Sequence, residues 1–257
     1  MGLITFLSDF GYTDHYVAAV KAKILRSAPQ TQIIDISHDV EAYNIAHGAF
    51  VLNSLFREFP AGTVHLVAVD SQGSKQGRFL AVQFQDHYFV AADNGILSLI
   101  FESQPIEIVE LPVITPTTFA AKDILAPAAS ALANGTELQQ LGTSITHYRE
   151  LINRQLRLSD HAITGHVVHV DHYGNLITNV SRDSMDAIGH DRPFTVQFAR
   201  ESVQKISGDF TQVDEGDVIC FYNQQGWLSI GVNKGHASEL LGLHYDSQVN
   251  VHFKKII

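Results

Sequence analysis

Two different hydrophobic periodicities divide this chain, and they constrain its fold more than any other feature of the sequence. Up to about residue 140, short apolar runs alternate with segments whose apolar residues recur every three or four positions. Beyond about residue 155 the helical spacing nearly vanishes, and short β-rich stretches follow one another. Apolar strands that alternate with amphipathic helices are typical of a parallel sheet covered on both faces. The sequence therefore predicts an α/β domain followed by a smaller all-β domain.

The first part carries the signals of an open α/β sheet. Its apolar runs predict strands at 3–7, 32–36, 64–69 and 106–111. Helical spacing predicts helices from about Asp14 to Pro29, over 44–59 and over 122–134. Residues 79–84 and 88–92 flank Gln85-Asp86-His87, which predicts a hairpin. We expect a mostly parallel sheet with helices on both faces.

The second part predicts a small antiparallel β-barrel. Its β-rich stretches are 162–170, 176–180, 194–198, 218–221, 227–232 and 249–253. Turn residues separate them, as in small all-β domains. The polar segment around residues 140–160 marks the boundary, so we expect an α/β domain over 1–150 and a β-barrel domain over 160–257.

The net charge of -10 limits the kinds of binding partner, and the single cysteine bears on the cellular compartment. A protein this acidic has no basic face to release counterions from a nucleic acid, and it does not suit an anionic membrane surface. No segment is long enough to span a bilayer, and the N-terminus enters a strand without the features of a signal peptide. Cys220 cannot form a disulfide within one chain. We expect a cytoplasmic protein that binds neither nucleic acid nor membrane.

Two acidic residues, Asp9 and Asp70, follow predicted parallel strands. Ligands of open α/β sheets bind beyond the carboxyl ends of such strands. An aspartate there can cap the next helix, which is a serious alternative for Asp9, or it can accept both hydroxyls of a ribose. The sequence contains no GxGxxG motif and no P-loop to bind a diphosphate. A ligand without phosphates, such as a nucleoside or its sulfonium derivative, fits better.

A second constellation lies in the β-rich part, where residues 171–175 have the sequence DHYGN. Gly174-Asn175 fits a simple hairpin turn. Asp171 and Asn175, at the two ends of that turn, also form a carboxylate–amide pair suited to the ammonium and carboxylate of an amino acid. Both interpretations remain open on the residues alone. No spacing of the 14 histidines predicts a metal site.

Several segments together resemble one family, in order and over nearly the whole chain. They are Leu7-Ser8-Asp9-Phe10-Gly11 with Asp14-x-Tyr16-Val17, Ile34-Asp35-Ile36-Ser37-His38, Gly62-Thr63-Val64-His65 leading to Val69-Asp70, Asp93-Asn94-Gly95, Asp123-Ile124-Leu125-Ala126-Pro127-Ala128-Ala129, Asp171-x-x-Gly174-Asn175-x-x-Thr178-Asn179 and Val232-Asn233-Lys234-Gly235-His236-Ala237. Each segment is weak alone, but the ordered set is strong. On these residues the chain resembles the S-adenosyl-L-methionine hydroxide adenosyltransferases, relatives of the bacterial fluorinase and chlorinase.

The resemblance implies an N-terminal α/β domain, a C-terminal β-barrel domain and a homotrimer. Active sites in this family lie between the N-domain of one subunit and the C-domain of its neighbour. The family reaction displaces methionine from ribose C5′ of S-adenosyl-L-methionine, with water or hydroxide in most members and halide in a few. The nucleoside ligand is the substrate itself, so no separate cofactor and no metal are implied.

The resemblance also implies roles for individual residues. Asp70 corresponds to the catalytic carboxylate of the hydrolytic members. The positions that correspond to substrate-binding residues are Asp9 at the ribose hydroxyls, Tyr43 near the ligand, Asp171 with Asn175 at the methionine end, and His236 with Ala237 where backbone groups meet adenine. The usual family residue at position 236 is Asn.

Two positions depart from the hydrolytic pattern. The pattern D-P-G-V-G followed by two arginines corresponds to residues 70–78, which places Gly77 at the catalytic arginine and Arg78 at the second one. The pattern T-F-H-G-R-D corresponds to residues 118–123, which places Ala120 at the catalytic histidine. Neither Gly nor Ala has a side chain that donates a hydrogen bond, so two members of the Asp-Arg-His set are absent.

These departures leave two main functional hypotheses, beside a third with a different nucleophile or a different 5′-substituted adenosine as substrate. In the first, the protein hydrolyses S-adenosyl-L-methionine with Asp70 as its main polar catalyst, unless a cation also takes part, namely Lys75, Arg78 or Lys122. In the second, it is a catalytically weakened paralogue that binds S-adenosyl-L-methionine or a nucleoside without efficient turnover. Halogenation is disfavoured because the Asp70 carboxylate would repel an incoming halide.

Overall fold

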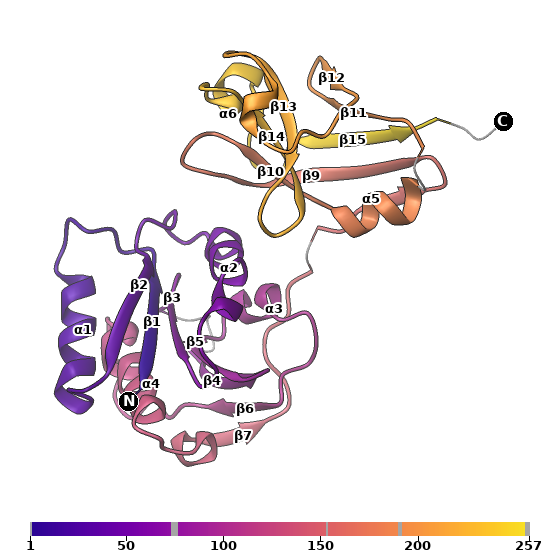
Figure 1. Cartoon of the computed structure of the whole chain (residues 1–257). Helices are drawn as coiled ribbons and strands as arrows, with labels where there is room; N and C mark the ends of the chain where they lie inside the picture. The colour runs from indigo at the N-terminus through magenta and orange to yellow at the C-terminus, as the bar shows by residue number, and fades with distance from the viewer. Residues whose placement is uncertain (1, 73–76, 153, 190–191, 255–257) are drawn as a thin grey trace. The chain divides into compact units, whose positions relative to one another are not determined.

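The structure is a computed structural model that describes residues 2–72, 77–152, 154–189 and 192–254. The chain divides into two compact units, Met1–Ile152 and Asn153–Ile257, called the α/β unit and the β unit below. Figure 1 traces the chain through the two units in order. In the described part of the chain, no helix has both the length and the apolar character needed to cross a membrane.

The α/β unit is built on one mixed sheet. Its strands are β1 (Leu3–Ser8), β2 (Gln32–Ser37), β3 (Val64–Ala68), β4 (Phe79–Phe84), β5 (His87–Ala92), β6 (Glu107–Glu110) and β7 (Thr143–Ile145). They lie in the order β2-β1-β3-β5-β4-β6-β7. The first four strands in this order, β2-β1-β3-β5, are parallel to one another. The remaining strands, β4, β6 and β7, are added through antiparallel pairs. The predicted hairpin is confirmed as β4 and β5.

Helices cover both faces of this sheet, as the continuous apolar strands predict. The main helices are α1 (Tyr16–Ser27), α2 (Ile45–Asn53), α3 (Ile96–Ile100) and α4 (Ala126–Ala133), the last preceded by a π-helical turn at Ala121–Leu125. Helices α1 and α4 pack on one core, and α2 and α3 pack on a second core (Figure 1). Residues of β3 alternate between the two cores: Leu66 belongs to the first and Val67 to the second.

The helix predicted over 44–59 is shorter than expected. It ends at Asn53, and a 3-10 turn at Phe56–Glu58 follows it. The next residue, Phe59, is extended, with φ -81° and ψ 151°. Pro60 disfavours helical dihedrals at the residue before it, so the apolar spacing continues here without a continuous helix.

The β unit is an antiparallel, nearly closed barrel. Its strands are β8 (Arg157–Ser159), β9 (Ala162–Val170), β10 (Leu176–Ser181), β11 (Phe194–Phe198), β12 (Glu201–Val203), β13 (Val218–Tyr222), β14 (Trp227–Val232) and β15 (Gln248–Phe253). The order is β12-β11-β15-β9-β10-β14-β13, with β8 paired to β9, and the end strands β12 and β13 approach each other. The short helices α5 (Arg182–Gly189) and α6 (Ala237–Leu241) interrupt the strands, although no helical period predicts them.

Candidate functional site

The side chain of Asp9 connects the segments that follow the carboxyl ends of β1, β2 and β3. Its Oδ2 accepts the backbone N–H of Tyr43 at 2.9 Å and of Asp70 at 3.1 Å. Asp9 follows β1, while Tyr43 and Asp70 follow β2 and β3, the strands on either side of β1. The alternative role as a helix cap is not the one in the structure, because α1 begins at Tyr16 with His15 as its N-cap residue.

Both residues bound by Asp9 have unusual backbone conformations. Tyr43 has φ 64° and Asp70 has φ 47°, in the left-handed region that side chains other than Gly rarely adopt. Each costs about 1–2 kcal/mol, and such residues concentrate at ligand-binding and catalytic sites. Two such residues on a single carboxylate oxygen make this edge of the sheet a candidate functional site.

The carboxyl group of Asp70 has a shifted pKa. Burial raises the pKa of Asp70 above its ordinary value, and the negative charge of Asp9 raises it further. The positive charge of Arg149 opposes these effects and lowers the pKa. A carboxylate in this setting holds a proton more tightly than an ordinary aspartate. It can therefore act as a general base on a bound water.

Asp93 and Asn94 belong to the Asp93-Asn94-Gly95 motif but are not among the predicted site residues. Asn94 is 4% exposed, and its Nδ2 donates to the carbonyl oxygens of Val69 at 3.0 Å and Asp70 at 3.1 Å. Asp93 is 3% exposed, and its Oδ1 accepts the backbone N–H of Arg149 at 2.7 Å. This motif therefore contacts both the Asp70 segment and the segment that carries Arg149.

Two of the cations considered as substitutes are held in other interactions. Arg78 donates from Nε to Asp93 Oδ2 at 2.9 Å and makes a second bond to the same oxygen. The Lys122 ammonium lies 3.4 Å from Asp123 Oδ1 and over the ring of Phe119. Lys75 lies outside the described residues.

A partly buried row of polar side chains begins at Ser8, the residue before Asp9. Ser8 and His38 are both fully buried, and Ser8 Oγ lies 2.6 Å from His38 Nδ1. His38 Nε2 lies 3.2 Å from Asp35 Oδ1, and Lys21 donates to Asp35 Oδ2 at 2.5 Å. The residue types are those of a nucleophile triad, but a fully buried serine cannot reach a substrate. These polar side chains therefore stabilise the end of β1, where Ser8 Oγ also accepts the N–H of Phe10.

In the β unit, the predicted turn forms and Asp171 closes it. Its Oδ1 accepts the N–H groups of Tyr173 and Asn175, both at 2.9 Å, and its Oδ2 accepts Asn175 Nδ2 at 2.9 Å. Gly174 has φ 82°, as a residue at the tip of a tight turn requires. The carboxylate and the amide thus bind each other, and one of about four acceptor positions of Asp171 remains unused.

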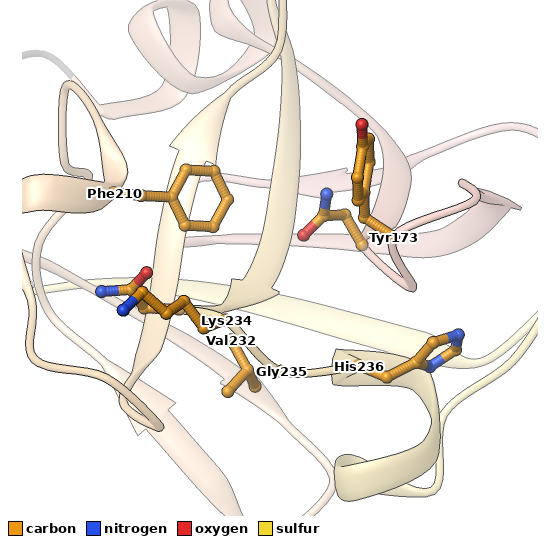
Figure 2. Close-up of a pocket in the computed structure, with 8 residues that line it drawn as sticks. Tyr173, Phe210, Val232, Lys234, Gly235 and His236 are labelled. Carbon is orange, nitrogen blue, oxygen red and sulfur yellow. The ribbon is translucent and has the colours of Figure 1, made fainter.

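A pocket of about 560 Å³ opens beside this turn. Its lining residues are Tyr173, Asn175, Phe210, Val232, Asn233, Lys234, Gly235 and His236. Figure 2 shows the rings of Tyr173 and Phe210 on opposite sides of the pocket. An aromatic pair with nearby amides suits a flat, hydrogen-bonding ring. In the described part of the chain, no group of His, Cys, Asp and Glu side chains could hold a metal ion.

The structure places His236 in the lining of this pocket, and Ala237 follows it in the chain without lining the pocket. His236 lines it and is the N-cap residue of α6, where Nδ1 accepts the N–H of Glu239 at 3.3 Å. Its ring packs against Gly174, because a Cβ at that glycine would lie 2.4 Å from the ring. Ala237 is fully buried as the first residue of α6. The turn and α6 thus form one packed structure.

The fold and the two sites define a class of protein. Its α/β unit carries two aspartates at the carboxyl ends of parallel strands, and a β-barrel unit with an aromatic pocket follows in the sequence. The chain matches the SAM hydroxide adenosyltransferase N-terminal domain over residues 4–142 and the C-terminal domain over residues 165–250. It therefore belongs to the S-adenosyl-L-methionine hydroxide adenosyltransferase family, which confirms the resemblance found in its motifs.

Individual relatives agree with this assignment. An (R)-S-adenosyl-L-methionine hydrolase of Thermus thermophilus is 30% identical over 93% of this chain and 95% of its own. One from Methanocaldococcus jannaschii is 26% identical over 98% and 96%. A fluorinase of Nocardia brasiliensis is 25% identical over 90% of each chain. The crystal structure of an uncharacterized conserved protein from Thermotoga maritima is similar, with a TM-score of 0.89 and 32% identity over 97% of this chain and 99% of that one.

Proposed function

We propose that this protein hydrolyses S-adenosyl-L-methionine to adenosine and methionine, with Asp70 as its catalytic carboxylate. The observation that carries the proposal is the held position of Asp70 at the carboxyl edge, with its N–H bound by Asp9 at 3.1 Å. Burial and the Asp9 charge raise the pKa of Asp70, which makes it a stronger proton acceptor. The relatives named as hydrolases support the same reaction.

In the proposed step, a water oxygen attacks C5′ of the ribose while the bond from C5′ to the sulfonium sulfur breaks. The electron pair of that bond goes to sulfur, so methionine leaves as a neutral thioether. The proton lost by the water passes to the Asp70 carboxylate and then to solvent, and adenosine carries the new 5′ hydroxyl. The protein must supply a held, in-line water in a partly dry pocket.

The substrate-binding residues that we propose are Asp9, Tyr43, Asp171, Asn175, His236 and Ala237. Asp9 uses Oδ2 for the two backbone N–H groups, which leaves Oδ1 for the ribose hydroxyls. Asp171 retains one acceptor position, which an ammonium group of the methionine end would fill. Adenine would enter between the rings of Tyr173 and Phe210, in the pocket that His236 also lines. Ala237 directly follows His236 as the first residue of α6.

The first test is an incubation with S-adenosyl-L-methionine in chloride-free buffer, followed by chromatography of the products. We expect adenosine and methionine, and a loss of turnover of about 100-fold or more in Asp70→Asn with affinity nearly unchanged. Asp160→Asn, at an exposed aspartate of the β unit, is the matched control. Unchanged turnover in Asp70→Asn would show that the assignment of Asp70 is wrong.

A second candidate function is ligand binding without efficient turnover. It is favoured by Gly77 and Ala120, which have no donor side chain, and by the ion pair that engages Arg78 with Asp93. Adenosine from Gly77→Arg/Ala120→His, but not from the native protein, would support it. Both substitutions are strained, because Gly77 has φ 60° and Ala120 is 1% exposed, so thermal unfolding of the double variant must be measured as well.

We further propose a cytoplasmic homotrimer with active sites shared between subunits, on the strength of the family resemblance. Light scattering of the purified protein tests the assembly. Mixing Asp70→Asn with Asn175→Ala tests the shared site, because the two lesions lie in different units. Recovery of turnover in the mixture is expected if one subunit supplies Asp70 and its neighbour supplies Asn175. A monomer in solution, or no recovery in mixed trimers, contradicts the proposal.

A further inference from the structure

Asp70 is held at both ends of its backbone, from two different strands. Its N–H donates to Asp9 Oδ2 at 3.1 Å, and its carbonyl oxygen accepts Asn94 Nδ2 at 3.1 Å. Asp9 follows β1 and Asn94 follows β5, and these two strands flank β3 in the sheet. The contacts span 61 and 24 positions of sequence, so they form only when the sheet is assembled.

This double contact offsets a backbone conformation that is otherwise unfavourable. A φ of 47° is unfavourable for a residue other than glycine. The net contribution of one hydrogen bond is similar in size to the cost of this conformation, so the two contacts together are needed to hold Asp70 in place. With both contacts, the left-handed conformation is maintained and the carboxylate stays beside Asp9.

Asn94 is itself fixed, and an amide is the side chain that its position needs. Its Oδ1 accepts the N–H of Ile96 at 3.0 Å, while its Nδ2 donates to two carbonyl oxygens. An aspartate at this position would place its oxygens against those carbonyls, and an alanine would leave them without the donor. The next residue, Gly95, has φ 102° and lets the chain turn into α3 directly after the contact.

We propose that Asn94 is a positioning residue for Asp70, holding the carboxylate in the geometry in which it receives a proton. For catalysis, the inference rests on the proposed role of Asp70. Asp93 contributes to the same positioning, because its Oδ1 accepts the backbone N–H of Arg149. The positive charge of Arg149 lowers the pKa of Asp70. The Asp93-Asn94-Gly95 motif thus serves the site without contact with the substrate.

The test compares Asn94→Ala with Ser130→Ala. Ser130 is also buried and also donates to a backbone carbonyl, that of Ala126 at 2.8 Å, within α4. Asn94→Ala should lose more thermal stability than Ser130→Ala, because it removes three hydrogen bonds instead of one. Only Asn94→Ala should lower kcat, by about 10-fold to 100-fold with KM nearly unchanged. Asn94→Ser, which keeps a short donor, should give an intermediate loss and serves if the alanine variant does not fold.

The second measurement does not depend on turnover. The carboxyl carbon of Asp70 is titrated by NMR in protein labelled at aspartate, and its signal is identified by its loss in Asp70→Asn. Asn94→Ala should move the Asp70 midpoint down, towards the ordinary carboxyl value, as the side chain relaxes away from Asp9. A shift in protein that lacks turnover supports the positioning role while the hydrolase proposal fails. An Asp70 titration identical in native and Asn94→Ala protein overturns the inference.

Discussion

Asp9 and Asp171 are both aspartates that follow a β-strand, yet they hold entirely different structures together. The Asp9 carboxylate binds backbone groups 34 and 61 positions away, and so connects three strand ends of the α/β unit. The Asp171 carboxylate binds groups two and four positions away, within one turn of the β unit. The first aspartate builds a tertiary site, whereas the second stabilises a local turn.

This difference determines whether removal of the aspartate charge affects mainly function or mainly stability in each region. At the α/β edge, Asp9 and Asp70 repel each other, which raises the pKa of Asp70, and the fold maintains that arrangement. In the β unit, Asp171 is surrounded by three hydrogen-bond donors of its own turn. Loss of charge should therefore change function most in the first region and stability most in the second.

The largest expected effect is on ligand affinity in Asp9→Ala. A carboxylate that binds two ribose hydroxyls contributes about 1.5–3 kcal/mol per bond, so the Kd for S-adenosyl-L-methionine should rise by about 100-fold or more. Isothermal titration calorimetry measures this directly. In Asp171→Ala the rise should be smaller, because most acceptor positions of that carboxylate are used inside the turn. Equal losses in both variants would contradict the contrast between the two regions.

Acid should destabilise the α/β unit first. Burial lowers the pKa of His65 to about 3, and the imidazole lies 2.7 Å from Thr5 Oγ1 and 3.1 Å from His87. The neutral form is favoured in the folded state, so stability is complete above the unfolded pKa of 6.5 and is lost as pH falls from there towards 3. Between pH 7 and pH 5 the loss is about 2 kcal/mol.

Two probes separate the units in this experiment. Trp227 is the single tryptophan and lies in β14, so its fluorescence follows the β unit. Hydrogen exchange of peptides from β1 and β3 follows the α/β unit. In the β unit, burial lowers the pKa of His166, but this side chain is partly exposed, so its effect is expected to be small. His65→Gln should flatten the pH dependence of the α/β unit, and an unchanged slope would exclude His65 as its cause.

The next effect is on stability in Asp171→Ala. Removal of the carboxylate leaves the N–H groups of Tyr173 and Asn175 without their acceptor, which should cost about 1–2 kcal/mol in the β unit. Urea denaturation followed by Trp227 fluorescence measures the loss. Asp9→Ala is the control, since it should leave the Trp227 transition in place. A shift of the same size in both variants would mean that the turn does not stabilise the β unit locally.

The sequence predicted best what depends on local pattern. The strands over 162–170 and 227–232 coincide with β9 and β14, because period-two apolar spacing follows directly from the pleat. The turn at Gly174 was visible in the same way. Helix α6 was missed because five residues are too few to show a helical period.

The candidate site was predictable only in part. That Asp9 and Asp70 lie together follows from the rule that ligands bind at the carboxyl ends of parallel strands. That Asp9 binds the backbone of Tyr43 and Asp70, each with positive φ, depends on contacts across the sheet that no local pattern encodes. The same is true of Asn94, whose motif was visible in the sequence although its contact with Asp70 was not.

The smallest expected effect is in His236→Asn, which introduces the residue that the family resemblance implies at this position. His236 caps α6 with Nδ1 at 3.3 Å from the N–H of Glu239, a long contact, whereas Asn is among the best N-cap residues. The cap is therefore retained, although the histidine ring that packs on Gly174 is lost. These effects oppose each other, so the free energy of unfolding should change by less than about 0.5 kcal/mol. His236→Ala removes both cap and ring and should cost about 1 kcal/mol by Trp227 fluorescence. Equal costs in the two variants would show that packing on the turn, and not the cap, is what position 236 contributes.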